Sequence, residues 1–172
     1  MVTVYDLKQK FQNLLRPAVS KLAEKGYTPN QLTWAALLLS ILSGVFLALS
    51  SGAALALICI PFILFIRMAL NAMDGMLAKE HDMKSDNGAI LNEISDIISD
   101  IAIYLPFALI AGVSNYYVVF FVIAAMLTEV VGILGWAVKH ERRFDGPMGK
   151  SDRAVIVGII SLLLGCGVEP GG

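Results

Sequence analysis

Long apolar stretches dominate this sequence and constrain its fold more than any other feature. Hydrophobic residues make up 57% of the 172 residues and charged residues only 16%, whereas ordinary soluble domains carry about 25% charged residues. A helix needs about 20 mostly apolar residues to span a membrane. Five such stretches lie at about 32–49, 53–78, 88–110, 116–138 and 154–168. We therefore predict an all-α integral membrane protein with five evident transmembrane helices.

The first thirty residues have a different pattern, in which apolar residues recur every three or four positions between basic ones. Such a helix lies in the headgroup region with its apolar face toward the acyl chains, and a solvated helix packed on protein is the alternative. Pro17 should kink or interrupt it. We divide the chain into an amphipathic interfacial helix and turn at 1–30 and a transmembrane domain at 31–172, with Thr28 or Asn30 capping the first span.

Basic residues lie almost entirely on one side of this topology. Twelve of them fall in the N-terminal segment, the loop at 79–84 and the stretch 139–153, and none falls in the connections near 50–52 and 112–115. Under the positive-inside rule, basic loops stay in the cytoplasm. We expect the N-terminus on the cytoplasmic face of an inner membrane, and we expect no nucleic-acid partner, since the basic residues do not gather on a soluble module.

Polar side chains recur inside the spans, where one charge near the bilayer centre costs about 3 kcal/mol. They follow steps of three or four residues, so each set shares one face of its helix. Because a short loop joins the second and third spans, the two polar stripes should meet in one cytoplasm-facing cavity. The stripe of the second span comprises Arg67, Asn71 and Asp74, and that of the third comprises Asn92, Asp96 and Asp100, with Glu93 beside it.

Oxygen donors at this density suit a hard divalent cation such as Mg²⁺, Mn²⁺ or Ca²⁺. The glycines at 75 and 88 would let a phosphorylated ligand approach the helix backbone closely. In the alternative, the acids pair with Arg67 and Lys79 or line a route for protons or ions. The spacing favours a metal-dependent site and leaves these alternatives open.

The stretch from Asn71 to Asp96 resembles the signature of the CDP-alcohol phosphatidyltransferases. That signature is D-x-x-D-G-x-x-A-R, eight residues, then G-x-x-x-D-x-x-x-D, and every spacing matches. The resemblance implies an enzyme of phospholipid biosynthesis that moves a phosphatidyl or related phosphate group from a CDP-linked donor, commonly CDP-diacylglycerol, to an alcohol and releases CMP. The family usually has six spans, against five evident here, and often forms homodimers, which makes a homodimer a candidate.

The resemblance also assigns roles to single residues. The acidic positions hold Mg²⁺ or Mn²⁺ in a two-metal site, and the last of them, Asp96, is the base for the acceptor hydroxyl. From its position deep in the fourth span, and not from the resemblance, Glu129 either supports the acceptor pocket or pairs with Arg67. The metal positions are Asn71, Asp74, Asn92 and Asp96, with Asp100 and Glu93 as further candidates. The nucleotide and diphosphate positions are Gly75, Ala78, Lys79 and Gly88, and the candidates for acceptor or phosphate contacts are Lys150, Arg153 and Arg67.

Three positions depart from the signature: Asn71 and Asn92 replace acids, and Lys79 replaces the arginine. Two lost negative charges should weaken divalent binding, and lysine keeps the charge without the bidentate fork of arginine. One interpretation is a divergent enzyme with a rearranged metal site, another is a protein that binds a CDP-linked lipid without turnover, and a third is an ion or proton carrier. We favour the enzyme, because Asp74-Gly75 and Asp96 are retained.

Overall fold

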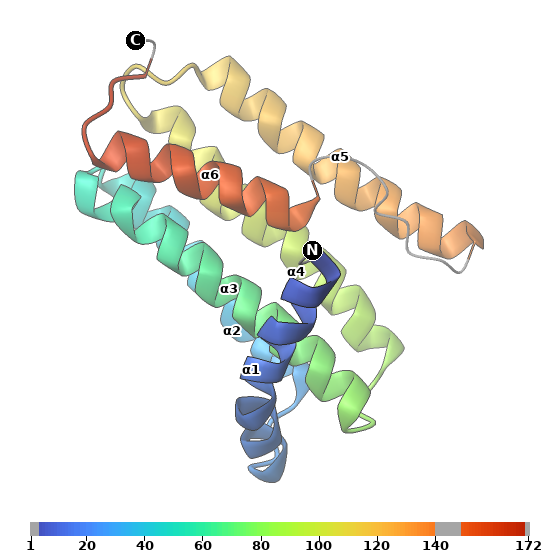
Figure 1. Cartoon of the computed structure of the whole chain (residues 1–172). Helices are drawn as coiled ribbons and strands as arrows, with labels where there is room; N and C mark the ends of the chain where they lie inside the picture. The colour runs from blue at the N-terminus through green and yellow to red at the C-terminus, as the bar shows by residue number, and fades with distance from the viewer. Residues whose placement is uncertain (1–3, 140–148, 171–172) are drawn as a thin grey trace.

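The computed structural model describes residues 4–139 and 149–170, and the regular structure within these ranges is entirely helical (Figure 1). The all-α prediction is confirmed, and every predicted apolar stretch contains a helix. The helices are α1 Val4–Glu24, α2 Pro29–Leu49, α3 Ala54–Glu80, α4 Asp86–Tyr104, the 3₁₀ helix η1 Leu105–Leu109, α5 Asn115–Lys139 and α6 Lys150–Gly165.

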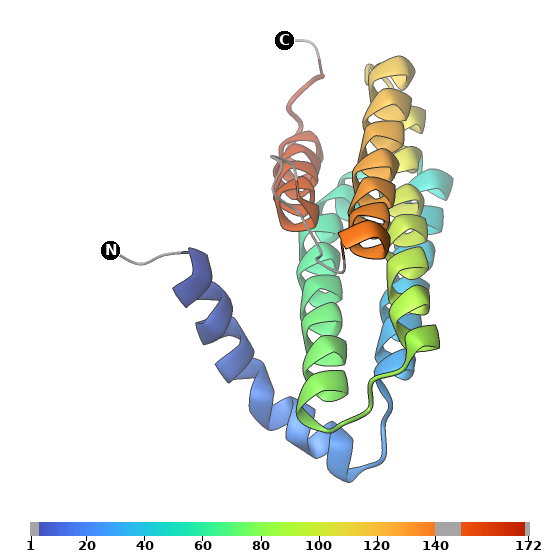
Figure 2. The ribbon, with the colours of Figure 1, turned by 90° about the vertical axis from the view of Figure 1, so that its right-hand side faces the viewer.

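Three described helices are long and apolar enough to cross a membrane on their own: α2, α3 and the part of α5 from Asn115 to Gly135. Helix α4 lies against α2 and α5, and α6 lies against α3, in the same bundle (Figures 1 and 2). Helix α4 carries acidic residues along one face and α6 has only 16 residues. The five-span prediction is thus confirmed by length and composition for three helices and stays a prediction for α4 and α6.

Helix α1 is continuous through Pro17, so the predicted interruption does not occur. Its C-terminal half packs on α3: Val19 is fully buried, and Arg16 donates to both carboxylate oxygens of Glu80, Nε to Oε2 at 3.1 Å and Nη2 to Oε1 at 3.0 Å. Toward the N-terminus the helix leans away from the bundle (Figure 2). Leu14 remains 75% exposed, which leaves an apolar side chain on α1 available to the lipid headgroup region.

Helices α2 and α4 each begin with a local cap. Thr28 is the N-cap of α2, and its backbone N–H donates to Gln31 Oε1 at 2.9 Å. Ser85 caps α4, and its hydroxyl accepts from the backbone N–H of Gly88 at 3.1 Å. Of the two capping candidates for α2, the structure selects Thr28. Pro29 follows it at the first helical position, where a missing N–H costs nothing.

Helices α2 and α4 approach so closely that a side chain is excluded at one position. A Cβ atom built on Gly44 of α2 would lie 1.8 Å from the backbone carbonyl oxygen of Ala102 in α4. Next to this contact is the main apolar core, which fills the half of the bundle away from the motif. Its buried members include Leu47, Leu57, Ile60, Ile103, Tyr104 and Phe107. Close packing of α2 on α4 therefore fixes the register of the polar stripe on α4.

We predict that Gly44→Ala lowers the free energy of unfolding by about 1–3 kcal/mol, because the added methyl group overpacks the α2–α4 contact. The matched control is Gly135→Ala in α5, where a Cβ would meet no atom within 4 Å. There the substitution should raise stability by up to about 1 kcal/mol through helix propensity. Thermal unfolding in detergent, followed by far-UV circular dichroism, measures both variants. Equal effects at the two positions would contradict this packing.

Candidate functional site

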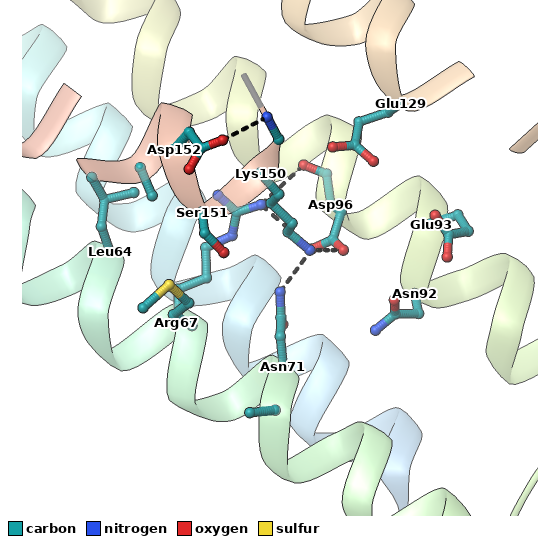
Figure 3. Close-up of a pocket in the computed structure, with 14 residues that line it drawn as sticks. Leu64, Arg67, Asn71, Asn92, Glu93, Asp96, Glu129, Lys150, Ser151 and Asp152 are labelled. Carbon is teal, nitrogen blue, oxygen red and sulfur yellow. Dashed lines mark hydrogen bonds and ion pairs between the residues drawn. The ribbon is translucent and has the colours of Figure 1, made fainter. Parts of the chain in front are cut away.

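A pocket of about 530 Å³ opens between α3, α4, α5 and the first turn of α6 (Figure 3). Most of the side chains around it are polar or charged, although three apolar residues of α3 also contribute. The pocket collects residues from segments far apart in the sequence. The polar side chains that line it are Arg67, Asn71, Asn92, Glu93, Asp96, Glu129, Lys150, Ser151 and Asp152.

The two halves of the motif meet across α3 and α4. Asn71 Nδ2 donates to Asp96 Oδ1 at 2.8 Å, and Asn92 Nδ2 donates to Asp74 Oδ2 at 2.7 Å. Each hydrogen bond joins an asparagine of one helix to an aspartate of the other, so the four positions that the signature assigns to metal ligands form two amide–carboxylate pairs. The expected meeting of the two polar stripes is confirmed.

Asp74 also receives a hydrogen bond from α2, which the sequence did not indicate. The hydroxyl of Thr33 donates to Asp74 Oδ2 at 2.8 Å, and both residues are buried. From the sequence alone, a threonine near the start of an apolar span would be interpreted as a neutral packing residue. Only the packing of α2 on α3 in three dimensions shows that its partner is Asp74. Thr33 therefore joins the site as a residue that holds the Asp74 carboxylate in place.

Asp96, the expected base, is held by three donors. Arg67 Nη2 lies 3.1 Å from its main-chain oxygen and 3.4 Å from Oδ1, which also accepts from Asn71. Lys150 Nζ forms an ion pair with the other carboxylate oxygen, Oδ2. Figure 3 shows Lys150 and Asp96 side by side at the pocket. The carboxylate is thus compensated by one arginine from α3 and one lysine from α6.

Behind the pocket, a buried chain of alternating charges connects α3, α4, α5 and α6. Arg67 Nη1 lies 2.6 Å from Asp100 Oδ1, and Arg153 Nη2 lies 3.0 Å from Asp100 Oδ2. Arg153 also pairs with Glu129 and donates to the hydroxyl of Thr128 at 2.9 Å. Glu129 lines the pocket, but its ion pair is with Arg153, and the alternative of a pair with Arg67 is wrong. Spacing alone could not place α6 beside α5.

The candidates for nucleotide contacts occupy different environments. A Cβ on Gly75 would meet no atom within 4 Å, which leaves open space beside the backbone of α3. A Cβ on Gly88 would lie 2.8 Å from both Asn30 Oδ1 and Ser85 Oγ, so a side chain here would displace the Asn30 amide and the Ser85 hydroxyl that caps α4. Lys79 is exposed at the end of α3 and Ala78 is partly buried. Roles for all four in nucleotide binding stay predictions.

Comparison with known proteins bears on the same segment. A model of the CDP-alcohol phosphatidyltransferase family matches residues 26–168. The chain belongs to this family. Inner membrane protein YnbA of Escherichia coli (strain K12) is 46% identical over 161 residues, which cover 94% of this chain and 80% of that protein. The resemblance seen between Asn71 and Asp96 is confirmed, and the family as a whole transfers substituted phosphate groups and binds CDP-alcohols.

Divalent metals serve this family generally, but the donors in this chain do not fit a two-metal centre. Asp74 and Asp96 are the only carboxylates left among the four metal positions, and both accept an amide N–H from an asparagine. Metals need oxygen lone pairs, which an N–H or an ammonium group does not provide. Within residues 4–139 and 149–170, no group of three or more His, Cys, Asp and Glu side chains could hold a metal ion.

Within the buried ion-pair chain, the contributions of Arg153 and Glu129 to the free energy of unfolding should be strongly coupled. We predict that Arg153→Met lowers the free energy of unfolding by about 3–5 kcal/mol, because it leaves Glu129 buried without its cation. The double variant Arg153→Met/Glu129→Gln should lose less, since the uncompensated charge is gone. Unfolding in detergent across the double-mutant cycle measures the coupling. Additive losses would show that the two side chains do not interact.

Proposed function

We propose that this protein transfers a phosphatidyl or related substituted phosphate group from a CDP-linked donor, such as CDP-diacylglycerol, to an alcohol and releases CMP. The observation that carries the proposal is the meeting of both motif halves at one pocket of about 530 Å³, where a carboxylate and an ammonium group lie together. Membership of the family supports the class of reaction.

We place the protein in the inner membrane with its N-terminus and pocket toward the cytoplasm, and we count α4 and α6 as membrane helices. The relative YnbA is named an inner membrane protein. On α4 the acidic stripe is buried, while Ile90, Ile94 and Ile98, spaced four residues apart, are 54%, 50% and 41% exposed. An apolar stripe outward and an acidic stripe inward is the arrangement expected of a polar helix within a bilayer.

In the proposed reaction, Asp96 takes the proton from the acceptor hydroxyl. The hydroxyl oxygen then forms a bond to the phosphorus that carries the lipid, and the bond from that phosphorus to the oxygen of CMP breaks. Lys150 pairs with Asp96 Oδ2 and also lines the pocket. A diphosphate entering the pocket offers Lys150 another anionic partner, which releases Oδ2 for the hydroxyl.

Binding of a CDP-linked lipid without turnover is the second candidate. The neutral residues at 71 and 92 favour it, since each is engaged in a hydrogen bond to the carboxylate across from it rather than supplying negative charge. This function would use the same pocket and the same cation. The two candidates differ in one product, CMP.

We predict that the purified full-length protein in lipid nanodiscs releases CMP from CDP-diacylglycerol when supplied with a panel of polar alcohols. The reaction should be run with Mg²⁺, with Mn²⁺ and with EDTA, and CMP should be quantified by chromatography. Tight nucleotide binding without CMP release for every alcohol and every condition would rule out the enzyme and leave the binding function.

The base assignment has its own test. Asp96→Asn should lower turnover by about 100-fold or more, because the amide cannot accept the hydroxyl proton, while CDP-diacylglycerol still binds. Asp82→Asn in the exposed loop between α3 and α4 is the matched control and should leave turnover unchanged. Rates of CMP release and binding of a labelled donor are measured for both. An Asp96→Asn variant with full activity would show that another group is the base.

A further inference from the structure

The carboxylate at the last acidic position of the motif is in contact with a cation from another helix. Lys150, the first residue of α6, pairs through Nζ with Asp96 Oδ2, and Asn71 Nδ2 donates to Oδ1 of the same carboxylate. Asp96 is therefore contacted by a positive charge on one oxygen and by the amide that replaces an acid on the other. Figure 3 shows these three side chains converging at the pocket.

Every carboxylate of the ion-pair network around this point is in contact with a cation. Three carboxylates, those of Asp96, Asp100 and Glu129, are in contact with three cations, those of Arg67, Lys150 and Arg153. A divalent ion added at Asp96 would lie beside Lys150 and Arg67, where like charges repel strongly at short range in a partly dry site. The two cations in contact with Asp96 therefore disfavour a metal there while Lys150 is present.

Arg67 and Lys150 both line the pocket, and Lys150 is the more accessible of the two. The side chain of Lys150 is 32% exposed, whereas those of Arg67 and Arg153 are 4% and 2% exposed. Lys150 lines the pocket, and a lysine ammonium on its flexible stem carries three donors suited to phosphate oxygens. Lys150 is thus the cation that a diphosphate in the pocket would meet.

The start of α6 is fixed in a way that holds Lys150 at this place. The backbone N–H of Gly149 donates to Asp152 Oδ2 at 3.1 Å, which closes the first turn of the helix. One turn further along, Arg153 ties α6 to α4 through Asp100 and to α5 through Glu129. The ammonium is therefore presented by an anchored helix end.

We propose that Lys150 takes the place of a divalent cation in this protein, so that the diphosphate of a CDP-linked ligand binds to an ammonium group carried by α6 and needs no metal ion. The proposal rests on the proposed function for the class of ligand, a nucleoside diphosphate, but not on turnover.

Binding of CDP to the purified full-length protein in nanodiscs, measured by isothermal titration calorimetry, tests this. Wild-type protein should bind CDP with affinities that agree within about threefold in EDTA and in Mg²⁺ or Mn²⁺. Lys150→Met should weaken binding by about tenfold or more in both, and Lys150→Arg, which keeps the charge, should weaken it less. Lys84→Met, in the exposed loop, is the matched control and should bind as wild type.

A second set of variants restores the signature. Asn71→Asp/Asn92→Asp/Lys150→Met returns the two acids and removes the ammonium, so this protein should bind Mn²⁺, seen by electron paramagnetic resonance, and should need it to bind CDP. Wild-type protein should bind no stoichiometric Mn²⁺. Loss of wild-type CDP binding in EDTA with recovery in Mn²⁺, or no CDP binding in any condition, would overturn the proposal. A lack of CMP release alone would overturn only the proposed transferase activity.

Discussion

The buried ion-pair chain from Arg67 through Asp100 and Arg153 to Glu129 is the constraint on which the rest of the structure depends. Unpaired charges of this kind are costly inside a membrane protein, and each of these is compensated only when α3, α4, α5 and α6 lie in one register. Apolar contacts between the helices are not directional in the same way. The charges therefore select one arrangement among the many that would bury the apolar faces.

The same register creates the site. With Asp100 fixed between two arginines, Asp96 lies one turn nearer the pocket on α4, opposite Asn71 on α3. With Arg153 fixed on α6, Lys150 lies one turn nearer the pocket as well and reaches Asp96. Structural ion pairs and the candidate functional pair are thus successive turns of the same two helices. A substitution in the buried ion-pair chain should also change the geometry of the pocket, because both depend on how α4 and α6 are aligned.

The sequence predicted the positions of the helices well, because apolar runs and turn residues are local signals: the first span was expected at 32–49 and α2 is Pro29–Leu49. It also placed the stripes of α3 and α4 opposite each other, since a short loop leaves these helices little choice. It could not show that Glu129 and Arg153 pair with each other. These residues are 24 positions apart on two different helices, and the spacing of residues along one helix does not reveal which other helix it contacts. The sequence made Lys150 a candidate for acceptor or phosphate contacts, but its contact with Asp96 depends on where α6 begins and could not be predicted.

The ion pair between Lys150 and Asp96 offers an electrostatic reason for the two asparagines that replace acids in the motif. In the family signature, four carboxylates would be balanced by two divalent ions before any substrate enters. Here two carboxylates remain in the motif, and one of them, Asp96, is compensated by Lys150 together with Arg67, which is shared with Asp100. A neutral amide opposite each aspartate keeps the hydrogen bond without adding charge that a metal would have to offset. Restoring the acid at position 71 while Lys150 and Arg67 remain would place a second carboxylate against Asp96, whose charge these two cations already offset.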